Sequence, residues 1–175
     1  MKTKNLLMLL LIASTLVIVS CEKDKTDLPL EYKFVLLDTL GNEKTEFNQG
    51  ENIIFSFQVI NKSSEDLFLE NFFPNNDFFR VYEPNTNEGT LDYGVPYTGF
   101  TLSAGYFVYE NDTLKIKYPW NNINSENATN TILFGNNKRP NLSIGSFTTS
   151  FSQSFKYGNN INTEEKHFAI NFTIK

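Results

Sequence analysis

Alternating apolar residues between Gly50 and Asn61 constrain the fold of this chain more than any other feature. Every second position carries a bulky apolar side chain, namely Ile53, Phe55, Phe57 and Val59. Residues that alternate in this way face one side of an extended strand, and β-branched and aromatic side chains suit the half-buried surface of a sheet. The stretch therefore predicts a central β-strand, and the polar residues after Asn61 predict a turn before the apolar run resumes at Leu67.

Several other segments carry the same two-residue period. It is clearest in Thr113–Trp120, where Trp120 falls on the apolar side, and in Lys166–Lys175. The remaining expected strands are Glu31–Asp38, Leu67–Phe73, Phe78–Tyr82, Phe147–Tyr157 and a short one at Thr131–Phe134. Tyr82–Glu110, which is rich in Gly and Tyr, is expected to be the least regular part. These seven to nine short strands, separated by turns, predict an all-β antiparallel sandwich.

One segment allows a second interpretation. Phe147, Phe151 and Phe155 are four residues apart, a spacing that also fits one face of a helix. The residues between them are mostly Ser and Thr, which form helices poorly and suit strands or turns. We therefore expect a strand here.

The chain is long enough for one core and too acidic for nucleic acid. All but the first 20 of its 175 residues are expected to form the mature protein, and a domain of that size buries roughly two-thirds of its unfolded surface. Its formal net charge is −5, and loss of Lys2 and Lys4 makes the mature protein more acidic still. Because no basic cluster is present, binding to a phosphate backbone is not expected.

The N-terminus has the features of an export signal. Lys2 and Lys4 precede a short apolar segment, Leu6–Val19. A basic tip followed by such a run is typical of a secretory signal, and the run is shorter than the roughly 20 residues that span a bilayer. Residues 1–20 are therefore predicted to be a signal peptide.

Ile18-Val19-Ser20-Cys21 resembles a bacterial lipobox, with an aliphatic residue at −3, a small residue at −1 and the acceptor cysteine at +1. The resemblance implies cleavage before Cys21, a diacylglyceryl thioether on its sulfur and an acylated amine, which together hold a protein to a membrane stably. The alternative is an ordinary signal with a chance cysteine. Residues 21–29 are predicted to form the lipidated tether, and residues 30–175 the domain.

The predicted location is the cell envelope, with the lipid in the outer membrane. Acidic residues directly after the cysteine direct surface display in some Bacteroidota lipoproteins. Here Lys23 and Lys25 alternate with them, so both the periplasmic and the surface face stay open.

The sequence offers little for catalysis. Cys21 is the only cysteine and His167 the only histidine, and no Gly-x-Ser-x-Gly motif is present. Zinc prefers several Cys or His ligands, so no metal site is expected. The carboxylates of Glu65-Asp66 and Glu164-Glu165 are expected to be solvated turn charges, and Glu83–Gly89 a plain loop rather than a calcium loop. We expect neither a cofactor nor an enzyme.

Four tyrosines are the candidate ligand-binding residues. They are Tyr93, Tyr97, Tyr106 and Tyr109, on a segment punctuated by glycines. Their flat amphipathic rings could contact a sugar or a partner protein. The alternative is that several of them pack beneath the loop as a satellite core, because large aromatic residues are usually mostly buried.

Two threonines are candidate modification sites. Asp38-Thr39-Leu40 and Asp112-Thr113-Leu114 are similar to the short Asp-Thr-aliphatic O-glycosylation sites of Bacteroidota proteins. The similarity implies glycan attachment at Thr39 and Thr113.

Parts of the chain resemble the BsuPI (intracellular proteinase inhibitor) type of bacterial immunoglobulin-like domain. The resemblance rests on Phe47–Glu51 through Val59–Ser63, Asn111–Trp120, Leu142–Thr148 and Phe172–Ile174. It covers about half of the mature chain and implies an immunoglobulin-like β-sandwich. Tyr82–Glu110 has no counterpart in it, and this chain is expected to be exported, so the inhibitor activity in the family's name is not carried over.

We therefore expect an exported lipoprotein with a single immunoglobulin-like sandwich, acting as a non-enzymatic binding or structural module of the envelope. A peptidase-inhibitor-like module and a glycan-binding accessory protein are the alternatives.

Overall fold

A computed structural model describes residues 29–70, 77–86, 89–100, 105–121, 133–134, 139–157 and 161–175. Throughout these ranges the chain forms strands and turns with no helix, so the predicted all-β class is confirmed. The signal peptide, Cys21 and the tether up to residue 28 lie outside the described residues.

One layer of the sandwich contains the strand predicted as central. β3 (Ile54–Asn61) lies between β1 (Leu30–Leu37) and β9 (Thr113–Pro119), antiparallel to both. The register places Phe34 and Ile116 on either side of Phe57. Since side chains alternate between faces, each strand contributes every second residue to one apolar surface.

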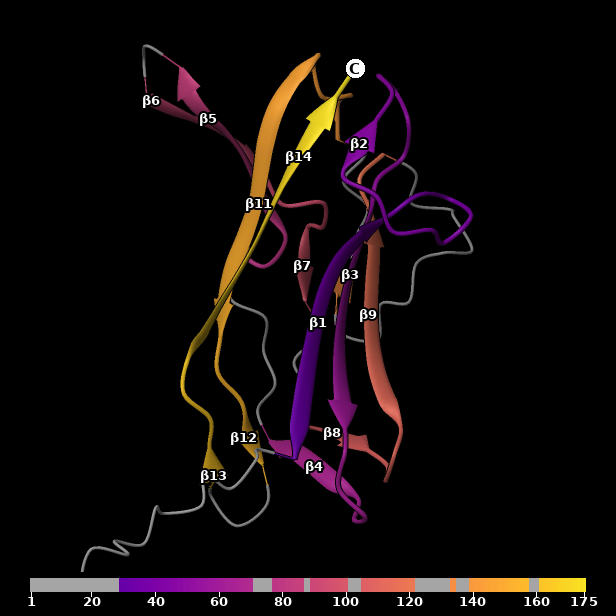
Figure 1. Cartoon of the computed structure of the whole chain (residues 1–175). Helices are drawn as coiled ribbons and strands as arrows, with labels where there is room; N and C mark the ends of the chain where they lie inside the picture. The colour runs from indigo at the N-terminus through magenta and orange to yellow at the C-terminus, as the bar shows by residue number, and fades with distance from the viewer. Residues whose placement is uncertain are drawn as a thin grey trace, which may run out of the picture.

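A second layer faces the first (Figure 1). Its order is β2 (Glu46–Phe47), β14 (Lys166–Ile174), β11 (Gly145–Gln153), β5 (Arg80–Thr86) and β6 (Gly89–Gly94). The pairing of β2 with β14 is parallel, whereas all the other pairings between described strands are antiparallel. The helical alternative for Phe147–Phe155 is therefore wrong, because β11 and β12 (Lys156–Tyr157) account for this segment.

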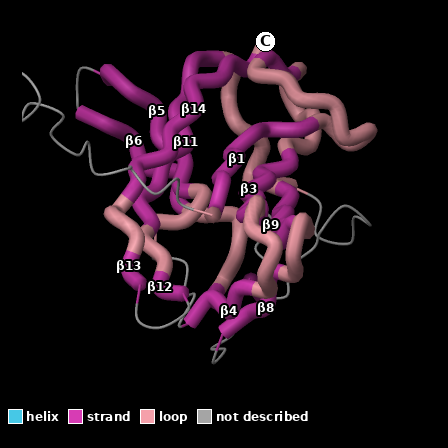
Figure 2. The backbone as a smooth tube through the Cα atoms, turned by 60° about the horizontal axis from the view of Figure 1, so that its bottom comes forward, coloured by secondary structure: helices cyan, strands magenta, loops and turns pink. Residues whose placement is uncertain are grey.

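A third sheet crosses one end of the sandwich (Figures 1 and 2). Its order is β13 (Ile161–Asn162), β12, β4 (Leu67–Glu70) and β8 (Gly105–Val108). β4 follows β3 along the chain and β12 follows β11, so this end sheet joins strands that continue from both layers. The short strands β7 (Gly99–Phe100) and β10 (Leu133–Phe134) pair separately.

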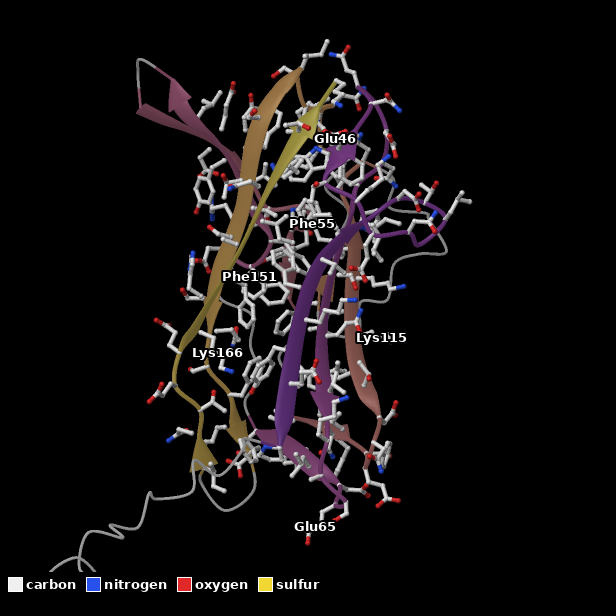
Figure 3. The ribbon with its side chains drawn as sticks, in the orientation of Figure 1. Glu46, Phe55, Glu65, Lys115, Phe151 and Lys166 are labelled. Atoms are coloured by element: carbon white, nitrogen blue, oxygen red, sulfur yellow. The ribbon has the colours of Figure 1, made fainter. Side chains whose placement is uncertain are left out.

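Aromatic side chains fill the space between the layers. Phe57 is 0% exposed, and its ring centroid lies 5.3 Å from that of Phe151 and 5.0 Å from that of Phe168. Figure 3 shows Phe55 from β3 and Phe151 from β11 between the two sheets. Trp120 is buried as predicted, and its Nε1 donates a hydrogen bond of 3.0 Å to the carbonyl of Pro140.

The strands differ from the prediction in number and in one region. Fourteen strands are described, of which nine have four residues or more and five have two. Two-residue strands are too short to show a period in sequence. Tyr82–Glu110 was expected to be irregular, but β5 and β6 form a hairpin there, with register shifts that obscure its alternation.

The predicted strand at Phe78–Tyr82 begins later than expected, at Arg80. Phe78 and Phe79 lie in the preceding turn, which the Arg80 amide closes on the Asp77 carbonyl at 2.8 Å. Phe79 has a φ of 62°, an uncommon conformation for a bulky residue, and both rings are fully buried. Apolar packing therefore holds this turn in a strained backbone conformation.

Within the described residues, no helix is long and apolar enough to cross a membrane.

Candidate functional site

Three aromatic rings lie in a row on the end sheet: Phe68 of β4, Phe107 of β8, and Tyr109 just after β8. We call this row the aromatic strip. Phe68 and Phe107 are direct cross-strand partners with ring centroids 4.8 Å apart. Phe107 and Tyr109 are two residues apart on one face, with centroids 6.3 Å apart and planes within 14° of parallel. The strip is therefore a continuous aromatic surface across two strands.

The rings face outward because the opposite face of the same strands is needed for the core. Leu69 and Val108, the neighbours of Phe68 and Phe107 along the chain, are buried. Alternation then places Phe107 and Tyr109 outside, where they are 59% and 58% exposed. Isolated exposed apolar residues are ordinary, but adjoining rings form a patch of the kind that marks interaction sites.

Gly105 allows the Phe68 ring to lie flat against β8. A Cβ atom at this position would come within 2.5 Å of the Phe68 ring and 2.4 Å of the Leu69 carbonyl oxygen. Only glycine leaves room for so close an approach. The Phe68 ring, the first of the strip, thus occupies space that a side chain at position 105 would fill.

Asn61 fixes the two turns that border the strip. It is 0% exposed, and its Nδ2 donates to the carbonyls of Glu65 at 2.7 Å, Val108 at 3.0 Å and Tyr109 at 3.2 Å. Its Oδ1 accepts from the amide and the hydroxyl of Ser63 at 2.9 and 2.7 Å. A buried amide satisfied in this way holds the turn after β3 against the end of β8.

Carboxylates surround one end of the strip. They are Glu65 and Asp66 in the turn after β3, and Glu110 and Asp112 in the turn after β8, and we call them the acidic turns. Asp66 Oδ1 accepts a 3.0 Å hydrogen bond from the Glu110 amide, which ties the two turns together. Figure 3 places Glu65 at the extreme end of the sandwich. None of the four carboxylates has an ion-pair partner among the described residues, whereas nearby Glu70 pairs with Lys156 at 2.9 Å.

The four candidate tyrosines do not form one site. Tyr97 is only 3% exposed and packs edge-on against Tyr118, with centroids 6.1 Å apart. Tyr93 is half-buried on β6, where its hydroxyl donates to Glu83 at 2.8 Å. Tyr106 packs against the core from the inner side of β8. Tyr109 is the exposed member of the four, and it belongs to the aromatic strip.

Electrostatics agree with these placements. Burial, together with the nearby Asp77 carboxylate, raises the pKa of Tyr97 above its ordinary value. Burial also raises the pKa of Tyr93, and its hydrogen bond to Glu83 adds to the shift. Both phenols are therefore protonated at neutral pH.

The two candidate glycosylation threonines differ in exposure. Thr39 is exposed in the turn after β1, which Asp38 Oδ1 stabilises by accepting from the amides of Leu40 at 2.9 Å and Asn42 at 2.8 Å. Thr113 is half-buried at the start of β9, and its amide donates to Asp112 Oδ1 at 2.7 Å. Thr39 is therefore the more accessible of the two hydroxyls.

His167 is exposed, on the outer face of the second layer. Its Nδ1 lies 3.3 Å from the Ser152 hydroxyl, a contact that follows from their being cross-strand partners in β11 and β14. No cluster of three or more His, Cys, Asp or Glu side chains that could hold a metal ion occurs in the described part of the chain.

Two surface hollows lie elsewhere and are poorly equipped for chemistry. One, of about 530 Å³, lies over β2, β11 and β14, and its carboxylate, Glu46, is paired with Lys175 at 2.7 Å. The other, of about 400 Å³, lies between Phe34 and Ile170, and its Lys44 is bonded to Glu51 at 2.6 Å. The charged groups in both are engaged within the chain.

Comparison of this chain with protein-family models, curated proteins and solved structures finds no match. The site therefore has to be judged from its own geometry.

Sequence reasoning identified Tyr109 but missed Phe68 and Phe107. Two short alternating series in the sequence could have indicated these rings. In the first, Phe68 lies between the carboxylates Asp66 and Glu70 at every second position; in the second, Phe107 alternates with Tyr109. Only the pairing of β4 with β8 brings the two series together.

Proposed function

We propose that this chain is an exported lipoprotein, anchored to the outer membrane through Cys21, whose immunoglobulin-like sandwich is a non-enzymatic binding module. Its binding surface is the aromatic strip. The observation that carries the proposal is the exposure of Phe107 and Tyr109 as adjoining, nearly parallel rings, whereas most other aromatic side chains among the described residues are buried.

The position of the strip suits an anchored protein. The carbonyl of Pro29 accepts a 2.7 Å hydrogen bond from the amide of Lys62, and Leu30 pairs with Asn61. The domain thus begins beside the acidic turns. A tether of residues 21–29 would reach at most about 30 Å, so an anchor at Cys21 would keep this end of the sandwich near the bilayer.

Among the ligands considered, the strip favours a glycan. The C–H face of a sugar ring stacks on flat aromatic rings, and its hydroxyl groups donate to neighbouring carboxylates. Phe107 and Tyr109 supply the rings, and Asp66 and Glu110 the carboxylates. Inhibition of a peptidase, the other alternative, would use a loop shaped for a protease cleft, and no described feature favours it over the strip.

Binding can be tested with the full-length lipidated protein on a glycan array. We expect retention that Phe107→Ala and Tyr109→Ala abolish and that Leu40→Ala does not change, because Leu40 is an exposed apolar residue in a turn remote from the end sheet. Retention that persists in both strip variants would contradict the proposal.

Anchoring needs a separate measurement. We expect radiolabelled palmitate to mark the wild-type protein and not Cys21→Ser, and the variant to leave the membrane fraction. A wild-type protein that takes up no label would remove the anchor from the proposal and leave the strip untouched.

A further inference from the structure

We infer that the aromatic strip and the acidic turns together select glycans that carry free amino groups and disfavour anionic glycans. The inference rests on the proposed function, since it names the chemical class of ligand for the same surface.

The two features adjoin at one end of the end sheet. Asp66 lies directly before β4, two residues ahead of Phe68, and Glu110 directly follows Tyr109 in the turn after β8. The bond from the Glu110 amide to Asp66 holds the two turns together at the end of the strip. A ligand stacked on Phe107 and Tyr109 would therefore lie next to the turn in which the Glu110 amide meets the Asp66 carboxylate.

These carboxylates can still accept hydrogen bonds. An ionised carboxylate has two oxygens with about four acceptor sites, and Asp66 uses one of them for the Glu110 amide. Asp112 likewise accepts from the Thr113 amide. The remaining acceptors suit an ammonium group, and the faces of Phe107 and Tyr109 attract a cation as well.

The local charge is unbalanced. Two lysines close to these turns are engaged with other carboxylates: Lys62 with Glu31 at 3.3 Å and Lys156 with Glu70 at 2.9 Å. Four carboxylates thus gather without a basic partner among the described residues. Since like charges repel within the screening length of about 10 Å at moderate salt, a uronate or sulfated glycan would be repelled where a glucosamine unit would be attracted.

The size of the strip favours a glycan over a basic protein. A stable protein interface commonly involves 20–30 residues on each side, around a buried centre (roughly 800 Å² per partner). The strip has only three rings: Phe68 on the four-residue strand β4, Phe107 on the four-residue strand β8, and Tyr109 just after β8. Such a surface matches one or two sugar rings.

The test compares three soluble probes of equal length: a glucosamine oligosaccharide, its N-acetylated form and an oligogalacturonate. Calorimetry with the full-length protein in neutral detergent should give the tightest binding for the glucosamine probe, about five- to tenfold tighter than for the N-acetylated form, and the weakest for the galacturonate. Raising the salt concentration should remove most of that preference.

Isosteric variants separate charge from stacking. Asp66→Asn with Glu110→Gln should abolish the preference for the glucosamine probe and retain binding of the N-acetylated one. Phe107→Ala with Tyr109→Ala should abolish binding of both. Glu164→Gln with Glu165→Gln, which removes two exposed carboxylates from another turn, is the matched control and should leave all three affinities unchanged.

Equal strip-dependent affinity for the three probes would overturn the inference and leave the proposed function standing. Preferential binding of the galacturonate would also overturn it. Binding of a lysine-rich peptide at the strip, with no affinity for any of the three glycans, would overturn the inference and also the proposal that the ligand of the strip is a glycan.

Discussion

Aromatic rings occupy two different settings in this protein, one inside the sandwich and one on its end sheet. Around Phe57, the rings of Phe78, Phe151 and Phe168 pack edge-on from several directions, and Phe57 is fully buried. In the aromatic strip, Phe107 touches rings only along the surface and exposes more than half of itself. The same residue type therefore stabilises the fold in one place and remains available to a ligand in the other.

The two settings are also positioned differently. Inside, the close packing of many apolar side chains fixes each ring. In the aromatic strip, two specific features position the rings. The hydrogen bonds of Asn61 hold the end of β8, and the missing side chain at Gly105 leaves room for the Phe68 ring. We infer that the position of the strip depends on a few polar or small residues, whereas apolar packing fixes the inner rings.

The largest effect is expected from removing the central inner ring. Phe57→Ala leaves a cavity among the surrounding rings and should lower the free energy of unfolding by about 3–5 kcal/mol. Equilibrium unfolding in urea measures it, and Phe57→Leu should show a smaller loss because more of the volume is kept. A loss below about 1 kcal/mol for the alanine variant would mean that the inner rings are not packed as described.

The next largest effect should come from the polar network that links the core to the strip. Asn61→Ala removes the side-chain donor to the carbonyls of Val108 and Tyr109, while the Glu65 carbonyl keeps the Ser63 hydroxyl as a donor, and unfolding should become easier by about 2–3 kcal/mol. Asn61→Asp puts a carboxylate against the same carbonyl oxygens, so its loss should be greater at pH 7 than at pH 4, where the group can be protonated. An equal loss at both pH values would contradict this role for the amide.

The inner setting could be predicted from the sequence to a large extent. The alternation around Phe57 and in Lys166–Lys175 indicates which side chains face inward, because the core demands apolar residues at a period of two. Trp120 was placed correctly for the same reason. Sequence alone did not give the parallel pairing of β2 with β14, because two-residue strands carry no period.

The strip could be predicted only in part. Tyr109 was identified from its composition-biased segment, but the same reasoning also selected Tyr97, which the structure buries. A periodic pattern shows that the two faces of one strand differ in polarity. It does not show which strand, distant in the sequence, lies beside it in the sheet. The partnership of Phe68 with Phe107 depends on long-range pairing, and the role of Asn61 depends on the backbone carbonyls that it reaches.

A smaller effect on stability is expected from Glu51, a carboxylate at the end of the molecule remote from the strip. Its side chain accepts hydrogen bonds from Lys44 at 2.6 Å and from the Asn48 amide at 2.9 Å. Burial acts to raise the pKa of Glu51, but these hydrogen bonds outweigh it and hold the pKa below its ordinary value. Its stabilising effect is therefore complete above that ordinary value and is lost as the pH falls through the lowered one.

Glu51→Gln should accordingly lower the free energy of unfolding by less than about 1 kcal/mol at pH 7, and the difference from wild type should be smaller at pH 3. Urea unfolding at both pH values measures this. Glu164→Gln, in an exposed turn, is the control with no expected effect. A difference that grows on acidification would show that the sign assigned to the Glu51 shift is wrong.

The smallest effect on stability should come from the outer rings. Its size tests whether the rings of the strip, unlike the inner rings, contribute little to folding. Phe107→Ala should change the free energy of unfolding by no more than about 0.5 kcal/mol, because the side chain is mostly in water and its inward neighbour Val108 is untouched. Together with the expected loss of glycan retention, this would assign the ring to binding rather than folding. A loss above about 2 kcal/mol would instead make Phe107 part of the packed structure, and the contrast between inner and outer rings would no longer hold.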